Sequence, residues 1–367
     1  MPMPGMRKRY DISSIVLNGR ANIGDPPNLC YDSGMGRKPG QTHKQRAWYK
    51  RGTGPVAWLI FAAVRSAFAL MQVFPVQWNL RTARLCARIW KRLLPRHFNR
   101  AVEHIRLALG DALSDRQVTD LADQCLENVT MFAVEAICLQ RVVNRFTFAR
   151  HIDLVNFDDL LRLLVSGQGF ILVTGHYGSF ELPGHLLATL GFDVHAVMRP
   201  LDNEYLNRFI VQSRRTHGLK LIDKKGAMAT AEAIIRDGGL LAFIGDQDAG
   251  RKGMFVDFFG QPASTYKSIG LLAMSTKCPI VVGYARRRGH HARYEIGVER
   301  VIRPEEWTYE PDPLRWITQA YTSAIESTVR TEPSQYLWIH RRWKSKARTP
   351  GARKPHEMKN LITETQA

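Results

Sequence analysis

The chain has 367 residues, 45% of them hydrophobic, and its 52 Lys and Arg against 33 Asp and Glu give a formal net charge of +19. This composition supplies a real core, in one large domain or two small ones, and the charge predicts an anionic partner: nucleic acid, an anionic membrane, an acidic carrier protein or a phosphorylated substrate. The five cysteines are scattered with no Cys-x-x-Cys pair, which argues against a disulfide framework or a zinc site and indicates reduced thiols in a protein that faces the cytosol.

Residues 1–50 are basic and rich in Gly, Pro and Asn, with little apolar periodicity, so we expect a disordered arm. No apolar segment follows Met1 closely, so the arm lacks the pattern of a signal peptide. An unstructured extension and a wrongly assigned start are the simplest interpretations of it.

Residues 51–80 contain an apolar stretch, Pro55–Trp78, whose length approaches a bilayer span. Arg65 lies near its middle, where a charge is costly in hydrocarbon, and Pro75 closes it. A tryptophan lies near each end, as in interfacial anchors, and basic clusters flank both sides. A shallow, membrane-associating helix fits this pattern better than a span, and a buried core helix is the alternative.

Residues 81–345 are predicted to form one domain of the α/β class, followed by a basic tail over residues 346–367. Up to residue 150 the pattern is helical, including a capping box at Ser114. Beyond it, apolar runs alternate with helical segments, which predicts a mostly parallel central sheet flanked by helices, with the helical section on its N-terminal side. Strands are expected at 169–174, 193–198, 219–222, 239–245, 254–258 and 279–285, and helices at 179–190, 203–217, 226–237 and 266–277.

The chain is organised around residues 169–181. The apolar first half predicts a buried strand, and two glycines after it, Gly175 and Gly178, permit a turn. Ser179 is a fair N-cap for the helix that follows.

His176 and Glu181 lie on this turn. Residues five apart point to different faces of a continuous helix or strand, so the turn is what allows the two to meet. A histidine beside a carboxylate is a general base held in one tautomer. The plain alternative is a loop histidine followed by an exposed glutamate in the first turn of a helix.

Further polar side chains follow later strands. Arg199, after the second strand, is a candidate to clamp a phosphate or polarise a thioester carbonyl. The group Asp246, Gln247 and Asp248 follows another strand, and its carboxylates are candidates to bind acceptor hydroxyls or to hold Arg199. Lys267 precedes a helix and offers a donor for a phosphate. The alternative interpretation is that these polar side chains are simply exposed to solvent before turns and bind nothing.

The segment 333–344 is aromatic and basic, and it includes His340, Arg341 and Arg342. Such a patch suits a phosphate-bearing ligand or a membrane face. A solvated basic end with two packed tryptophans would give the same pattern. A phenylalanine cluster at 255–259 is similarly open to two interpretations, an acyl groove or core packing.

Five ordered blocks over residues 80–345 resemble the lipid A biosynthesis (lauroyl/myristoyl) acyltransferases, within the His-x4-Asp/Glu glycerolipid acyltransferase group. The blocks are HYGSFE at 176–181, the arginine at 199, GDQD at 245–248 with GMFVDFFGQPA at 253–263, KCPIVV at 277–282, and WIHRRWK at 338–344. The long basic arm is the chief departure from the pattern.

The resemblance implies an O-acyltransferase that moves a fatty acyl chain from an acyl carrier protein (or acyl-CoA) thioester to a hydroxyl of a lipid A precursor or related glycolipid. In that interpretation His176 takes the hydroxyl proton and Glu181 orients the imidazole, with no cofactor and no metal. The expected location is the membrane surface on the cytoplasmic face of a bacterial inner membrane.

Two alternatives stay open. One is acyl transfer to a phospholipid or mannoside-type glycolipid, since such relatives share these motifs. The other is a basic membrane-binding or nucleic-acid-binding protein without catalysis. We expect no nucleic-acid partner, because the sequence has no recognised binding module and its charge flanks an apolar segment. The presence of both His176 and Glu181 counts against a catalytically silent protein.

Overall fold

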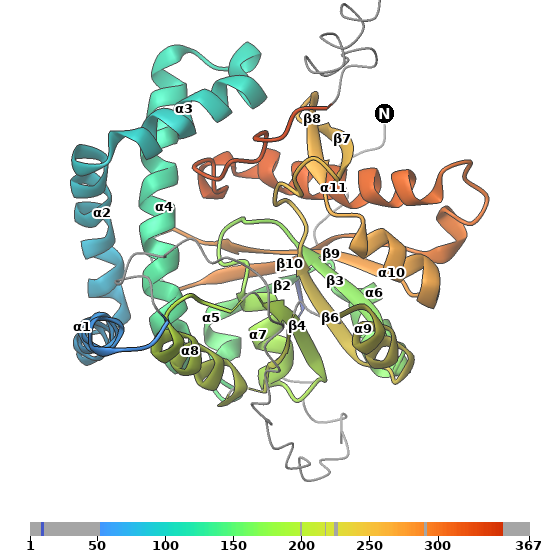
Figure 1. The fold of residues 1–367 in the computed structure, drawn as a ribbon, viewed down its shortest axis with the longest axis horizontal. Helices are drawn as coiled ribbons and strands as arrows, with labels where there is room; N and C mark the ends of the chain where they lie inside the picture. The colour runs from blue at the N-terminus through green and yellow to red at the C-terminus, as the bar shows by residue number, and fades with distance from the viewer. Residues whose placement is uncertain are drawn as a thin grey trace, which may run out of the picture.

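The computed structural model describes residues 9–10 and 52–347, except residues 199, 217, 224–226 and 290–291. A central sheet has the strand order β1-β2-β10-β9-β3-β6-β4-β5, with helices packed around it (Figure 1). Every neighbouring pair from β9 to β5 is parallel, whereas β10 is antiparallel to β9. The predicted α/β class with a mostly parallel sheet is confirmed. The strands of this sheet are β1 Arg9–Tyr10, β2 Ile152–Val155, β3 Phe170–Thr174, β4 Val194–Met198, β5 Lys220–Asp223, β6 Leu240–Ile244, β9 Ile280–Arg287 and β10 Tyr294–Ile302.

The strand β3 explains why the sheet forms where it does. All of its residues are buried. Phe170 and Leu172 enter one hydrophobic core, and Ile171 and Val173 enter a second, as the alternation of side chains along a strand requires. A strand covered on both faces reads as a continuous apolar run, which is the pattern that made β3 predictable.

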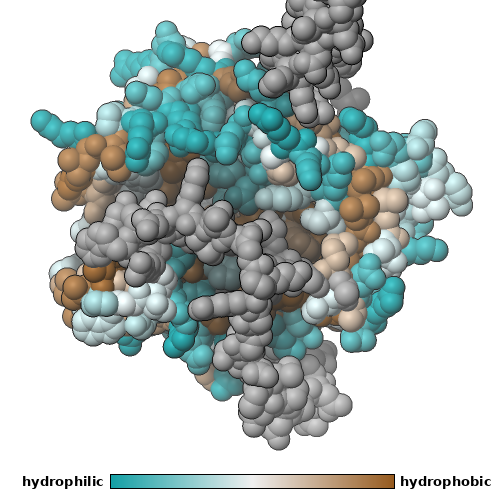
Figure 2. Space-filling model, viewed as in Figure 1, coloured by the Kyte–Doolittle hydropathy of each residue, from teal (hydrophilic) through white to brown (hydrophobic). Residues whose placement is uncertain are grey.

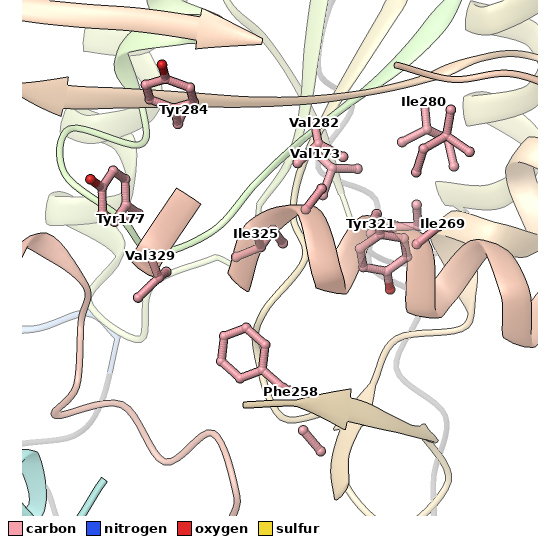
Figure 3. Close-up of a cluster of buried hydrophobic side chains, with 14 of the residues drawn as sticks. Val173, Tyr177, Phe258, Ile269, Ile280, Val282, Tyr284, Tyr321, Ile325 and Val329 are labelled. Atoms are coloured by element: carbon pink, nitrogen blue, oxygen red, sulfur yellow. The ribbon is translucent and has the colours of Figure 1, made fainter. Parts of the chain in front are cut away.

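The second core lies between the sheet and the helix α11, Pro313–Thr331. In Figure 3, Val173 and Val282 from the sheet lie close to Ile325 and Tyr321 of α11.

The described helices are α1 Pro55–Val73, α2 Val76–Leu93, α3 Pro95–Leu109, α4 Asp115–Val142, α5 Phe148–His151, α6 Asp158–Ser166, α7 Leu182–Thr189, α8 Glu204–Thr216, α9 Ala227–Arg236, α10 Ser268–Thr276 and α11 Pro313–Thr331.

The helices α2, α3 and α4 form the predicted N-terminal helical section. The capping box is present: the Ser114 hydroxyl accepts from the Gln117 backbone N–H, and the Gln117 side chain accepts from the Ser114 backbone N–H. The long helix α4 lies between α2 and the sheet, and α2 buries Leu80, Ala83 and Ala87 as it packs along α4. This section therefore joins the domain through α4.

Three local predictions were wrong. Ser179 is not a helix cap, because α7 begins at Leu182 and the Ser179 hydroxyl instead donates to Glu135. The strand β7, Met254–Phe258, pairs with β8, Gln261–Thr265, in a separate hairpin instead of joining the central sheet. The apolar stretch before residue 78 is two helices, since Pro75 has no N–H with which to continue α1.

The basic arm over residues 1–50 lies outside the described residues apart from β1, which pairs with β2. The tail beyond residue 347 also lies outside them. The domain boundaries at residues 50, 80 and 345 stay predictions.

Candidate active site

The turn after β3 is fixed on several sides. Gly178 has φ of +54°, and a Cβ on it would lie 2.1 Å from the carbonyl oxygen of Ala285, so glycine is required there. The Gly178 N–H donates to the Gln335 carbonyl over 2.9 Å, and the Ser179 N–H donates to Ala285 over 2.9 Å. The His176 carbonyl accepts from the Leu337 N–H over 3.0 Å. The backbone around His176 is therefore held between β9 and the C-terminal segment.

A buried carboxylate ties the same turn to α4. Glu135 accepts from the Ser179 hydroxyl over 2.5 Å, from the Arg287 guanidinium over 2.7 Å and from the Tyr294 hydroxyl over 2.9 Å. Its side chain is 2% exposed, so the charge is balanced within the protein by Arg287. This network could not be predicted from the sequence, because it joins residues from four separate segments of the chain.

His176 is hydrogen-bonded to Asp246. The ring Nδ1 lies 2.7 Å from Asp246 Oδ1, and the His176 backbone N–H donates to Oδ2 over 2.8 Å. Asp246 follows β6, and β6 is the parallel neighbour of β3, so both residues emerge at the same edge of the sheet. Since Nδ1 faces the carboxylate, Nε2 is the ring nitrogen left to act on a substrate.

The two groups shift each other's pKa. Burial alone would raise the pKa of the Asp246 carboxyl, but the charge and hydrogen bonds of His176 hold it below its usual range. Burial alone would lower the pKa of His176, but Asp246 outweighs burial and raises it, with a smaller contribution from the charge of Glu181. The imidazole is thus a base strengthened by a carboxylate that stays ionised.

Two rings contact His176. His340 stacks on it with ring centroids 5.1 Å apart and an interplanar angle of 19°. Phe180 meets it edge-on at 5.1 Å. Burial and the nearby charge of His176 lower the pKa of His340, so His340 is the ring of the pair that stays neutral.

Glu181 lies beside the site but bonds elsewhere. Its carboxylate accepts from the Arg214 guanidinium of α8 over 2.7 Å. The carboxylate hydrogen-bonded to the His176 ring is that of Asp246, whereas Glu181 acts on His176 through its charge. The predicted pairing of His176 with Glu181 stays a prediction.

A mostly apolar pocket of about 320 Å³ adjoins the turn. Phe180 lines it and also contacts His176, so this ring joins the pocket to the base. Phe180 stacks on Phe132 of α4 with ring centroids 4.4 Å apart. Glu135, Glu181 and Arg214 contribute its charged lining. The apolar lining includes Leu139, Leu172, Val197, Leu221 and Phe243.

The other predicted binding residues are placed as follows. Asp248 accepts from the backbone N–H and the hydroxyl of Ser345 over 3.2 and 3.1 Å, which fastens the C-terminal segment. Gln247, Lys267 and Arg341 are exposed. Arg199 lies outside the described residues.

Arg342 is buried at 1% exposure. Its guanidinium donates to the Ser264 carbonyl and to the Thr265 hydroxyl, each over 2.6 Å. These contacts join the C-terminal segment to β8. In the phenylalanine cluster, Phe258 and Phe259 belong to the hydrophobic core, which is the packing interpretation of that motif.

The structure thus brings together His176, Asp246 and His340 from three distant parts of the chain, beside an apolar pocket. Residues 49–345 match the family described as bacterial lipid A biosynthesis acyltransferase. The chain belongs to this family. Its basic arm precedes the matched region.

Curated relatives agree with the family match. The chain is 29% identical over 198 residues to the lipid A biosynthesis palmitoleoyltransferase of Escherichia coli (strain K12), which covers 53% of this chain and 62% of that protein. It is 24% identical over 201 residues to the lipid A biosynthesis lauroyltransferase of the same organism, covering 54% and 63%. It is 23% identical over 196 residues to the phosphatidylinositol mannoside acyltransferase of Mycolicibacterium smegmatis, covering 52% and 62%. Each match spans less than two thirds of the relative's length.

Proposed function

We propose that the protein is an O-acyltransferase that moves a fatty acyl chain from an acyl carrier protein thioester, or acyl-CoA, to a hydroxyl of a lipid A precursor or related glycolipid. The observation that carries this proposal is a base beside an apolar pocket: His176, paired with Asp246, contacts the Phe180 ring, and that ring lines the pocket. The family membership supports the acyl-transfer chemistry.

The geometry supports the following reaction as part of this proposal. The acceptor hydroxyl lies at His176 Nε2, which takes its proton as the oxygen attacks the thioester carbonyl carbon. A carbon–oxygen bond forms, the carbon–sulfur bond breaks, and the proton passes from the imidazolium to the departing thiolate. Asp246 holds the ring and stabilises its charged form, as the carboxylate of a catalytic triad does.

Glu181 adds negative charge near the imidazolium, and both Glu181 and its partner Arg214 line the pocket. We keep Arg199 as the candidate to polarise the thioester carbonyl or to clamp a phosphate of either substrate. The acyl chain would occupy the apolar pocket, with its carbonyl at the Phe180 end.

We also propose that the protein works at the cytoplasmic face of a bacterial inner membrane. Among the described residues, α1 is long and apolar enough to cross a membrane, and little of it is buried. The strongly basic surface would suit both an anionic leaflet and an acidic carrier protein.

The acceptor has a second candidate, a mannoside-type glycolipid, because relatives of that description match over a similar share of the chain. Mass spectrometry of cell lipids with and without the gene tests the proposal. We expect one glycolipid class to lose an acyl ester without the gene, and to regain it with wild-type protein but not with His176→Ala. Unchanged glycolipids, or full restoration by His176→Ala, would contradict the proposal.

A further inference from the structure

The helix α2 exposes a row of apolar side chains. Trp78, Leu85, Ile89 and Leu93 are exposed by 58%, 56%, 49% and 71%. The spacing of 3.6 residues per turn places them on one face, opposite the face that packs on α4. We call this row the α2 stripe. It runs about 22 Å along the helix at 1.5 Å per residue.

Basic side chains border the stripe. Arg81, Arg88 and Arg92 are exposed, and helical geometry places them along one side of it. The sequence of α2 contains no Asp or Glu. An apolar row with a basic flank is the pattern of a helix that lies in the interface of an anionic membrane.

The helix α1 has the length of a span, but one of its sides is already packed on the domain. Phe61 and Phe68 contact the Phe209 ring of α8, with centroids 6.3 and 6.1 Å apart. The Arg65 guanidinium lies 4.8 Å from the same ring. If α1 crossed a bilayer, α8 and its arginines would enter hydrocarbon beside it, at a high cost in free energy.

Both helices lie on the same flank of the molecule. In Figure 1, α2 runs along the left edge and α1 is seen nearly along its axis at the same edge, so both lie parallel to that face. Figure 2 shows brown, hydrophobic side chains at the left edge. The exposed side of α1 contributes Leu59, Leu70 and Val73. A flat bilayer surface would therefore meet both helices lengthwise.

We propose that α1 and α2 form one membrane-docking face that lies in the plane of an anionic leaflet, with the α2 stripe inserted beside α1, so that α1 does not cross the bilayer. This inference rests on the membrane attachment proposed above. The bilayer is the occupant that fits, because the apolar face is continuous over two helices and the α2 stripe carries a basic border. The helix α4 packs against α2 on one side and lines the apolar pocket on another. A single helix therefore separates the membrane-docking face from the candidate active site.

The first test measures binding of the full chain to vesicles of phosphatidylglycerol and phosphatidylethanolamine at high salt. The variant Leu85→Gln/Ile89→Gln/Leu93→Gln keeps the net charge and changes exposed positions alone. We expect at least tenfold weaker binding. The matched control, Val165→Gln/Leu271→Gln/Met274→Gln, removes exposed apolar side chains from α6 and α10 and should bind like the wild type. Wild-type binding by the stripe variant would overturn the role of α2.

The second test asks on which side of the membrane the N-terminus lies. A tag placed before residue 1 and the catalytic domain should both be cleaved by protease added to inverted inner-membrane vesicles. Protection of the tag while the domain is cleaved would show that α1 crosses the bilayer and would overturn the in-plane arrangement. Acyl transfer in detergent micelles separates this inference from the proposed function, because the stripe variant should keep wild-type turnover there.

Discussion

Two carboxylates act on His176, and they reach it differently. Asp246 is hydrogen-bonded to the ring, whereas Glu181 acts through its charge and is bonded to Arg214. A general base must be neutral to accept a proton, so a raised pKa of His176 confines activity to higher pH. In a plot of kcat/KM against pH, the acid limb is the fall in activity at low pH. Its position therefore reports how strongly each carboxylate raises the pKa of His176.

Replacing Asp246 with Asn should lower the maximal rate by about 100-fold or more, because the amide cannot stabilise the imidazolium. The pKa of His176 should fall, so the acid limb should move to lower pH. The measurement is kcat/KM between pH 5 and 9, with circular dichroism as the control for folding. If the acid limb of the variant lies at the same pH as that of the wild type, Asp246 does not set the pKa of His176.

Glu181→Gln should shift the limb in the same direction but less far, with a smaller loss of rate, because this carboxylate makes no hydrogen bond to the ring. The two variants are compared in the same assay. If Glu181→Gln proves the more damaging, the pair predicted from sequence operates in catalysis, and the Asp246 contact is structural.

The pairing of His176 with Asp246 shows what sequence reasoning lacked. Both were recognised as polar residues at strand ends, but the pairing depends on which strands are neighbours. β6 lies beside β3 although β4 and β5 intervene in the chain. Glu181, five residues from His176, was the nearer choice along the sequence. Spatial order across a parallel sheet is set by crossover packing that apolar runs do not reveal.

At the scale of elements, the turn after β3 is a rigid support. Gly178→Ala should destabilise the fold by about 2–4 kcal/mol, because a Cβ there adds a clash with the Ala285 carbonyl to the strain of a positive φ. Gly167→Ala is the matched control, since Gly167 has φ of +68° with open space around its Cβ.

The free energies of unfolding of both variants are measured with denaturant. The control should lose about 1–2 kcal/mol from backbone strain alone. Equal losses in the two variants would show that the turn relaxes easily and does not hold His176 by close packing.

Strands with continuous apolar runs could be predicted from the sequence. β3, β6 and the first half of β9 carry such runs. Elements that are stabilised by contacts with distant parts of the chain could not. β10 contains Glu295, buried at 2%, whose charge is balanced by Arg286 and Arg288. Helix α11 contains Thr318, Thr322 and Thr328, whose hydroxyls donate to carbonyls one turn earlier. Such residues weaken the helical signal of the sequence, and burial against the sheet overrides it.

For the whole molecule, the basic arm is separable in principle from the chemistry. Residues 1–48 precede the region that matches the family, and the site is built from residues 132–345. Deleting residues 1–50 should therefore leave the specific activity within about twofold, as judged by turnover of the purified protein in detergent. Loss of turnover with membrane binding preserved would assign the arm a part in catalysis.

The central claim is that His176, supported by Asp246, transfers an acyl chain from a thioester to a glycolipid hydroxyl. The most direct measurement incubates purified wild-type protein and His176→Ala with an acyl carrier protein thioester and a lipid A precursor, and follows the acylated product by mass spectrometry. We predict product with the wild type and at least about 100-fold less with His176→Ala, with circular dichroism showing that both proteins are folded. Equal product formation by the two proteins would contradict the account.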